Sequence, residues 1–151
     1  MTGRRIRMVA LGVVSRRTSD DRVTDDEQLL VERHRDPESG ETFYRPLGGG
    51  VEFGERSEDA LRREFREELG VELTGVSYLG TDEDVFTFDG ETHHEVWRVY
   101  ETDVVEDWPY EREEFTAREP ETGEEIECVW KSRAALETEE TFYPDGVLSE
   151  L

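Results

Sequence analysis

Lysine is almost absent from this sequence: Lys131 is the single one, and arginine supplies the rest of the 18 basic residues. Forty acidic residues outnumber them, which gives a formal net charge of −22 at pH 7. Binding of nucleic acid through a basic patch requires Lys and Arg side chains that neutralise phosphates. We therefore expect no nucleic-acid partner.

Cysteine and long apolar runs are also scarce. Cys128 is the single cysteine, so the chain has no internal disulfide, and we expect a small buried thiol. No signal-peptide pattern and no apolar run of spanning length occur, which predicts no membrane partner and a cytoplasmic location. With 151 residues and no repeat or linker, a single domain over 1–151 is expected.

The acidity itself admits three interpretations. One is nucleic-acid mimicry or a metal-binding surface. The second is disorder, against which stand a hydrophobic content of 34% and regular strand patterns. The third, which we favour, is adaptation to high salt, because the acids are spread through the whole chain and salt screens their repulsion. This halophilic interpretation predicts a fold that weakens when salt is removed.

The most informative stretch is residues 48–71, a glycine-rich loop that leads into one helix. Ser57 is the expected N-cap, and Glu58 and Asp59 place negative charge in the first turn. Gly70 is the expected residue just beyond the C-terminus of the helix.

The apolar face of this helix is formed by Ala60, Leu61, Phe65 and Leu69. On a helical wheel Glu64 and Glu68 fall inside that face, and Glu67 lies at its edge. A carboxylate turned inward must be paired, protonated or bound to a cation. Oxygen ligands suit Mg²⁺ or Mn²⁺, so the cluster predicts a site for such an ion.

The same stretch fits a known signature over 23 residues, G-x5-E-x7-R-E-U-x-E-E-x-G-U, in which U is a bulky apolar residue. The matching residues are Gly49, Glu55, Arg63, Glu64, Phe65, Glu67, Glu68, Gly70 and Val71. This signature is the Nudix box, so the chain resembles the Nudix hydrolases. It differs at Leu47, where many members carry proline before the glycines.

The resemblance implies an α/β fold of the α+β kind, in which an α/β/α sandwich surrounds a mixed β-sheet. It also implies a metal-dependent pyrophosphohydrolase that cleaves a nucleoside diphosphate linked to another group, as water attacks one phosphorus. The implied cofactor is Mg²⁺, with Mn²⁺ as a substitute, and the implied partner is a nucleotide-type small molecule. Whether the chain forms a homodimer stays open.

The family also implies roles for the box residues. Glu64, Glu67, Glu68 and the carbonyl of Gly49 would bind metal. One box glutamate would serve as the general base, and the family suggests Glu64, although its members differ in which acid has this role. Arg63 lies four residues before Glu67, close enough to hold a box acid in place. Glu55 would support the metal site or the loop.

Less specific interpretations remain beside these. The three glutamates could form a surface ion-pair ladder with neighbouring arginines. The protein could be a Nudix-fold module that binds or senses a nucleotide without cleaving it, or one whose acids hold a structural cation. Binding modules usually lose box carboxylates, and this chain keeps all of them, which favours the enzyme.

Outside the box the residues are less informative. Glu95 is a candidate further metal ligand or a solvated acid, and His93 and His94 point to opposite sides of a predicted strand. The aromatic residues that could stack on a base or simply fill the core are Tyr44, Phe53, Trp97 and Trp108.

The remaining elements are predicted from alternation and turn residues. The expected strands are 5–16, 28–33, 42–47, 51–53, 71–79, 85–88, 93–105 and 125–131. Loops are expected at 19–27 and 107–123, with turns at 36–40 and 88–91. Ser132 is the expected cap of a second helix that ends near residue 139, and residues 142–148 are expected to fold back onto the domain.

Overall fold

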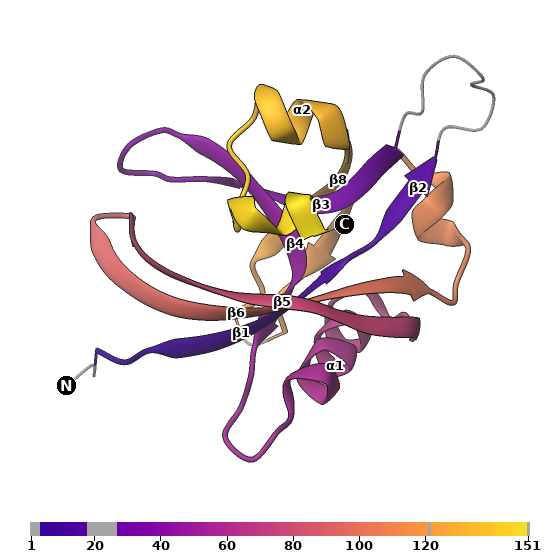
Figure 1. Cartoon of the computed structure of the whole chain (residues 1–151), viewed down its shortest axis with the longest axis horizontal. Helices are drawn as coiled ribbons and strands as arrows, with labels where there is room; N and C mark the ends of the chain where they lie inside the picture. Colours follow the sequence, from indigo (N-terminus) through magenta and orange to yellow (C-terminus); the bar gives the residue numbers. More distant parts are fainter. Residues whose placement is uncertain (1–3, 18–26, 121, 151) are drawn as a thin grey trace.

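The computed structural model describes residues 4–17, 27–120 and 122–150 (Figure 1). Its elements are β1 (Arg7–Val13), β2 (Ser15–Arg17), β3 (Glu27–Arg35), β4 (Thr42–Gly50), α1 (Ser57–Leu69), β5 (Leu73–Phe88), β6 (Glu91–Val104), η1 (Trp108–Glu111), β7 (Glu114–Arg118), β8 (Glu125–Ser132), α2 (Arg133–Thr138) and η2 (Asp145–Glu150).

Within these residues the strands form one eight-stranded sheet in the order β5-β6-β1-β4-β3-β8-β7, with β2 paired to β3. Strand β1 runs parallel to β6 and antiparallel to β4, so the sheet is mixed. Figure 1 shows α1 and α2 on opposite sides of the strands. The predicted α+β fold around a mixed sheet is therefore confirmed.

Alternation along β1 divides the core between the two sides of the sheet. Ala10 faces α1 and packs in one buried cluster with Leu61 and Phe65, whereas Val9 belongs to a second cluster with Leu136 of α2. Phe65 is 1% exposed, and its replacement by Ala would cost about 3–5 kcal/mol. Burial of Phe65 thus fixes which face of α1 meets the sheet.

The predicted glycine loop is the end of a strand. Gly48 and Gly49 lie in β4 and pair with Leu11 and Ala10 of β1, respectively, and Gly50 pairs with Val9. The brief strand expected at 51–53 does not form, since the chain leaves the ladder after β4 and turns toward α1.

Two further strand predictions were wrong in their bounds. The strand expected over 5–16 divides at Val14 into β1 and β2, and β2 turns aside to pair with β3. The segments 71–79 and 85–88 belong to one long strand, β5, whose pairing with β6 shifts register before Ser77 and again before Gly80. These irregularities interrupt the alternation that would have indicated one strand.

The predicted loop at 107–123 contains two elements, η1 and β7. Strand β7 is an edge strand of the sheet. Edge strands are often short and charged, so the sequence of β7 resembles that of a polar loop. Its Ala117 is 2% exposed and Phe115 is half-buried, and both contribute to the core beneath α1.

Two of the three predicted helix ends are confirmed, and the predicted cap of α1 is wrong. Gly70 has φ 72° and ends α1 as expected, and the Ser132 hydroxyl accepts a hydrogen bond from the Ala135 amide at the start of α2. Ser57 does not cap α1: it is the first helical residue, Arg56 precedes it, and the Ser57 hydroxyl contacts the Tyr100 hydroxyl instead.

The tail returns to the sheet as expected. Phe142 forms a bridge with Tyr44, and both Phe142 and Leu148 are buried. The turns at 36–40 and 88–91 are also confirmed. Most of the predicted loop at 19–27 lies outside the described residues, apart from Glu27, which begins β3.

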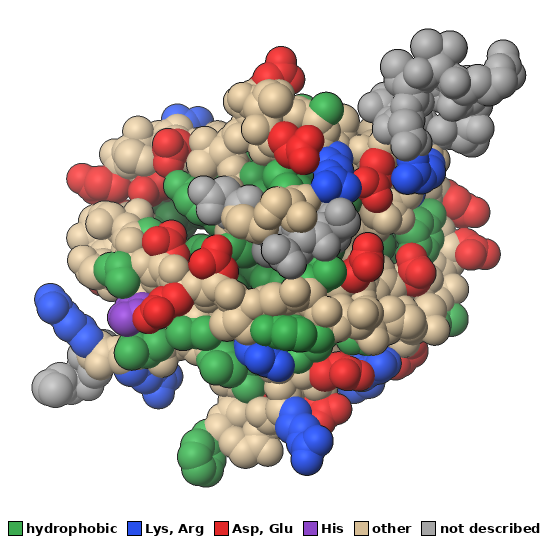
Figure 2. Space-filling view, in the orientation of Figure 1, with side chains coloured by type: hydrophobic (Ala, Val, Ile, Leu, Met, Phe, Trp, Pro, Cys, Tyr) green, Lys and Arg blue, Asp and Glu red, His purple; other side chains and the backbone are tan. Residues whose placement is uncertain are grey.

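Acidic side chains are distributed over the visible surface and do not gather in one patch (Figure 2). Among the described residues, no helix is both long enough and apolar enough to cross a membrane. Cys128 is buried, as predicted, and burial raises the pKa of its thiol.

Candidate metal centre

The helical wheel places the acids of α1 correctly. Glu64 and Glu68 are 7% and 9% exposed, close to the burial of the apolar residues beside them. Glu67, at the edge of the apolar face, keeps 42% of its side chain exposed. Two carboxylates are therefore turned inward on a single helix face, one turn apart.

Strand β4 approaches this pair so closely that only glycine fits. A Cβ added to Gly49 would collide with the carboxylate of Glu64. The absence of a side chain at this position lets the backbone of β4 lie against the acid of α1. Gly49 thus belongs to the wall of the acidic site, next to Glu64.

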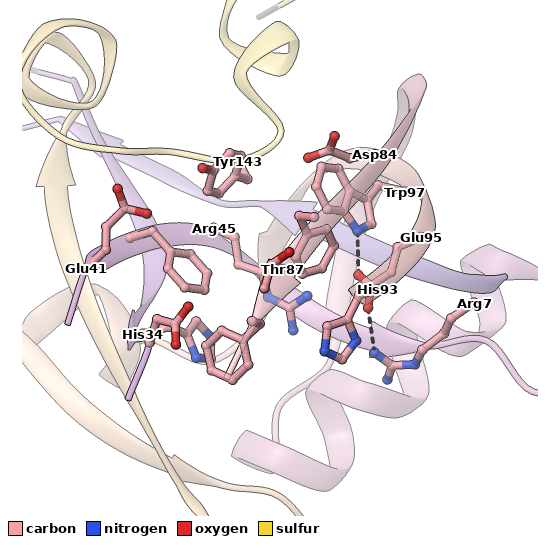
Figure 3. A pocket seen from close by; sticks show the side chains of 14 residues that line it. Arg7, His34, Glu41, Arg45, Asp84, Thr87, His93, Glu95, Trp97 and Tyr143 are labelled. Carbon is pink, nitrogen blue, oxygen red and sulfur yellow. Dashed lines mark hydrogen bonds and ion pairs between the residues drawn. The ribbon is translucent and has the colours of Figure 1, made fainter. Parts of the chain in front are cut away.

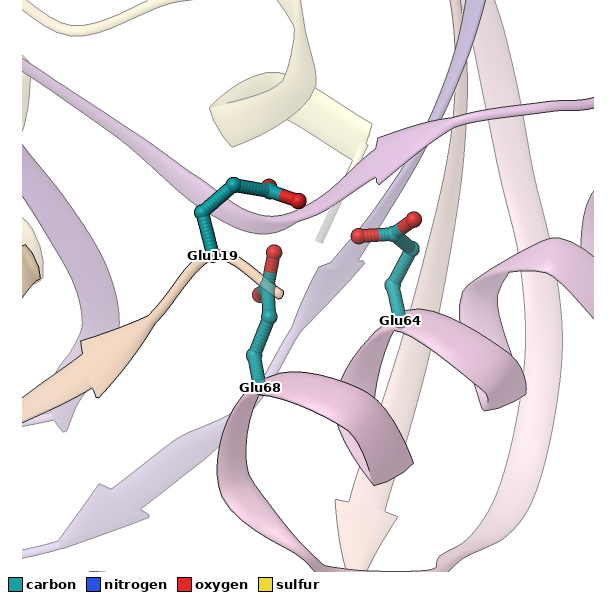
Figure 4. A group of neighbouring side chains, drawn as sticks. All are labelled: Glu64, Glu68 and Glu119. Atoms are coloured by element: carbon teal, nitrogen blue, oxygen red, sulfur yellow. The ribbon is translucent and has the colours of Figure 1, made fainter. Parts of the chain in front are cut away.

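A third carboxylate, from Glu119, completes the cluster (Figure 4). Glu64, Glu68 and Glu119 each offer one oxygen such that all three oxygens lie within 4.8 Å of one another. Glu119 directly follows β7, where its amide donates to the Glu124 carbonyl at 2.9 Å and its carbonyl accepts from the Gly123 amide at 2.8 Å. A tight turn thus holds the backbone of Glu119 opposite α1.

The pKa values of two carboxyls in this cluster are raised by their surroundings. Burial raises the pKa of Glu64, although Arg63 partly offsets the rise. Burial also raises the pKa of Glu68 strongly, and the carboxylates of Glu32, Glu64 and Glu119 raise it further. Burial among like charges therefore favours the protonated form of Glu68 when no cation is bound.

Arg63 organises the box around this cluster. Its Nε and Nη2 donate to both oxygens of Glu55 at 2.8 and 2.9 Å, and Nη2 also donates to the Gly50 carbonyl at 3.0 Å. Its Nη1 donates to Glu64 at 2.8 Å and to Glu67 at 3.1 Å. Arg63 therefore ties the end of β4 to α1 and orients Glu64, and Glu55 orients Arg63.

The structure does not bring every candidate to the cluster. Glu67 lies beside it, held by Arg63, and is not among its three members. Glu95 is buried elsewhere, where Oε1 accepts from the Trp97 indole at 2.7 Å. His94 contacts Glu83 at the surface at 2.7 Å, whereas His93 lines a pocket on the opposite face of β6 (Figure 3).

The aromatic candidates also separate. Tyr44 is buried, and Trp108 packs edge-on against Phe115 with ring centroids 5.0 Å apart, so both are core residues. Phe53 is fully exposed in the turn before α1. Trp97 alone among these four lines the pocket that contains His93.

Sequence reasoning missed Glu119, because the stretch around it was interpreted as a loop. The signal was present: Phe115 and Ala117 face inward along β7, and Glu119 continues the same alternation. An acid at the inward position just beyond a strand would have marked a third carboxylate for the cluster.

Three converging carboxylates form a set of ligands that suits a hard divalent cation, and the pKa values of Glu64 and Glu68 among them are raised. All of the donors are oxygen atoms, which suits Mg²⁺ or Mn²⁺ and leaves coordination positions for water and phosphate oxygens. The fit is supported by the donors themselves: a cation among them would remove the cost of burying like charges together.

The chain resembles known proteins both in sequence and in fold. The NUDIX domain model matches residues 7–148. The chain is 41% identical over 59 residues to the NAD-capped RNA hydrolase NudC of Pseudomonas putida, a match that covers 39% of this chain and 21% of NudC. It is 81% identical over 26 residues to the nucleoside triphosphatase NudI of Escherichia fergusonii, covering 17% and 18% of the two chains.

Among solved structures, the MutT NUDIX hydrolase from Burkholderia pseudomallei superposes with a TM-score of 0.64 at 22% identity, over 97% of this chain and 98% of that one. The NUDIX hydrolase from Nitrosomonas europaea gives a TM-score of 0.59 at 17% identity, over 96% and 85%. These likenesses define the class of fold. The chain belongs to the NUDIX family.

Proposed function

We propose that this protein is a metal-dependent pyrophosphohydrolase that cleaves a nucleoside diphosphate linked to another group, or a related nucleotide. The observation that carries the proposal is the convergence of Glu64, Glu68 and Glu119 in a buried site of the NUDIX fold. The chain spans only about a fifth of NudC and NudI in these matches, so the substrates in their names are guides to a class of compound.

In this proposal the three carboxylates and the carbonyl of Gly49 hold Mg²⁺ or Mn²⁺. Glu67, held by Arg63 beside Glu64, is the fourth carboxylate available to the site. A bound ion would neutralise the phosphate oxygens and lower the pKa of a water molecule.

The side chains have separate tasks. We assign Glu64 as the general base, because Arg63 orients it and its carboxylate lies directly against the backbone of Gly49. Arg63 and Glu55 act as positioning residues, since their contacts are to each other and to the box. This network would hold the base still while a water proton is transferred.

The test is hydrolysis of a panel of nucleoside diphosphate derivatives and nucleoside triphosphates, in molar KCl, with and without Mg²⁺. We expect turnover that requires the metal and is lost in Glu68→Gln. A protein that binds these nucleotides in the presence of Mg²⁺ but releases no product would be a binding module, the alternative considered above.

A further inference from the structure

One part of the sheet is uncovered next to α1. On β1, Ala10 packs beneath α1, whereas Met8, two residues earlier on the same face, is exposed. Met8 is level with Val96 of β6, which is only half-buried and belongs to neither core cluster. On the same face of the edge strand β5, Val85 is exposed as well. Three adjacent strands therefore present apolar side chains that nothing in the described part of the chain covers.

The same surface includes Ile6, which directly precedes β1 and is exposed. We call Ile6, Met8, Val85 and Val96 the apolar patch. Three of its members are among the six large hydrophobic side chains that are exposed in the described residues, so apolar exposure is concentrated here. Figure 2 shows hydrophobic side chains exposed below β5, on the side of the strands that carries α1.

Phe53 protrudes beside the apolar patch. It lies in the loop between β4 and α1, and Figure 1 shows this loop on the α1 side of the strands. The loop starts at the patch, because the Val51 amide donates to the Met8 carbonyl at 2.9 Å. The ring of Phe53 is fully exposed. Each copy of the protein thus offers a protruding ring and, next to it, an apolar surface that this ring leaves uncovered.

The loop and the border of the patch carry opposite charges. Residues 4–8, which lead into β1, contain three arginines and no acid. Two of these, Arg4 and Arg5, are exposed and form no ion pair within the described residues. Residues 52–59 around Phe53 contain four acids and one arginine, and Glu52 is exposed. The loop of one copy therefore complements the patch of another in charge as well as in apolar surface.

We propose that this protein forms a homodimer in which Phe53 of each copy packs on the apolar patch of the other. A second copy carries both halves of the contact, and a twofold axis uses them twice. Glu52 of one copy then lies near Arg4 and Arg5 of the other. An anionic membrane would also accept an exposed ring beside arginines, but it repels a chain with a net charge of −22. The inference is independent of the proposed activity, since Phe53 and the patch lie outside the acidic cluster.

The test is sedimentation equilibrium of the full chain in 2 M KCl, over protein concentrations from about 5 µM to 0.5 mM. We expect a mass twice that of one chain at high concentration, in reversible equilibrium with the monomer. Phe53→Ser should raise the dissociation constant by about a hundredfold or more, because two rings per dimer no longer leave water on association. The melting temperature of the monomer should not fall, since the ring is fully exposed within one chain.

Val85→Asp and Val105→Asp form a matched pair, because both valines are 58% exposed and only Val85 belongs to the apolar patch. The first change should weaken the dimer at least about tenfold, since it buries an unpaired charge in the contact. The second should leave the dimer unchanged. Arg5→Glu and Glu52→Arg should each weaken it, and the double variant should recover affinity because opposite charges face each other again.

Two results of these measurements would overturn the proposal: a chain that stays monomeric at every concentration, or a dimer that Val85→Asp and Val105→Asp weaken equally. Monomeric protein that binds vesicles of phosphatidylglycerol through Phe53 would assign the ring to a membrane surface and would overturn it as well.

Methyl NMR locates the contact. The signals of Met8 and Val85 should shift as the protein concentration rises, whereas the signal of Val105 should not. These shifts should vanish in Phe53→Ser, which removes the ring that packs on the patch. Shifts at Val105 without shifts at Met8 would place the interface elsewhere and contradict the proposal.

Discussion

Two buried glutamates on facing elements of this protein, Glu32 and Glu68, meet opposite electrostatic environments. Glu32 of β3 is 1% exposed and contacts Arg45 and His34. Burial would raise the pKa of Glu32, but the charge of Arg45 and the hydrogen bonds with His34 and Arg45 lower it below the ordinary value. Glu68 of α1 is surrounded by other acids, and its pKa is raised. Glu32 has the basic side chain of Arg45 in direct contact, whereas within the described residues no ion pair joins a basic side chain to Glu68.

This difference separates structural acids from candidate functional ones in a chain with 40 acidic residues. Acidic composition alone says little, because most of the carboxylates are at the surface. An acid that is buried against other acids is costly unless a cation joins it. The cluster of Glu64, Glu68 and Glu119 is therefore where a ligand from outside the chain is expected.

The largest effect should come from Glu68→Gln. This change removes a proposed metal ligand, so kcat/KM should fall by more than the roughly 10–100-fold usual for residues that only support a ligand. Glu67→Gln is the matched control on the same helix and should cost less. Steady-state assays with Mg²⁺ check both variants. Equal losses of kcat/KM would contradict the different roles that we assign to the buried Glu68 and the more exposed Glu67.

Glu119→Gln should fall in the same class as Glu68→Gln. The reason is its position in the cluster, which only the folded chain reveals. Glu124→Gln is the control, because Glu124 lies at the other end of the same turn and is exposed. If Glu119→Gln were as active as Glu124→Gln, Glu119 would not be a metal ligand, and only the acids of α1 would remain in the proposed site.

Glu32→Gln tests the other side of the comparison. It leaves the charge of Arg45 buried without its main partner, so the free energy of unfolding should fall by about 3 kcal/mol. Denaturant titration in high salt measures this. A loss comparable to that of Glu41→Gln, an exposed acid, would show that Arg45 does not depend on Glu32.

The two acids should also give opposite pH dependences in the metal-free protein. The pKa of Glu68 is above its ordinary value of 4.5, so above pH 4.5 this carboxyl holds a proton more often in the folded protein than in the unfolded one. The stability that Glu68 contributes therefore falls as the pH rises above 4.5. Glu32 has a lowered pKa, so its contribution is present above pH 4.5 and is lost as the pH falls through its folded pKa. Melting curves of Glu68→Gln should lose the first slope and show a melting temperature higher by a few degrees at neutral pH. An unchanged profile would contradict the raised pKa.

Salt should change the melting temperature least when the change is divided among the charged residues. The contributions of all surface charges add up over the chain. Screening by KCl reduces the self-repulsion of a net charge of −22, so the melting temperature should rise with added salt. Calorimetry from 0.1 to 3 M KCl measures the slope. A melting temperature independent of salt would contradict the halophilic interpretation.

The inward face of α1 can be predicted from the sequence, but most of the residues that surround this face cannot. Leu61, Phe65 and Leu69 are four positions apart, and this spacing alone predicts that Glu64 and Glu68 face inward. The face of a helix on which a residue lies depends only on local spacing. Glu119 is 51 residues beyond Glu68, and its place depends on how β7 pairs at the edge of the sheet. No local pattern fixes such a pairing.

The same limit applies to strands and caps. The glycines of β4 were read as a loop from composition, although their pairing with β1 makes them a strand. Ser57 has the side chain of a good cap, but the neighbouring Tyr100 hydroxyl engages it once β6 is in place. Tertiary contacts decided both cases, and local propensity did not.

The central claim is that Glu64, Glu68 and Glu119 bind one divalent cation between α1 and the turn after β7. Crystals grown with MnCl₂ in high salt, with data collected at a wavelength where manganese scatters anomalously, test it directly. The account predicts an anomalous peak bounded by oxygens of these three side chains. A peak elsewhere, or none with the three carboxylates turned apart, would contradict it.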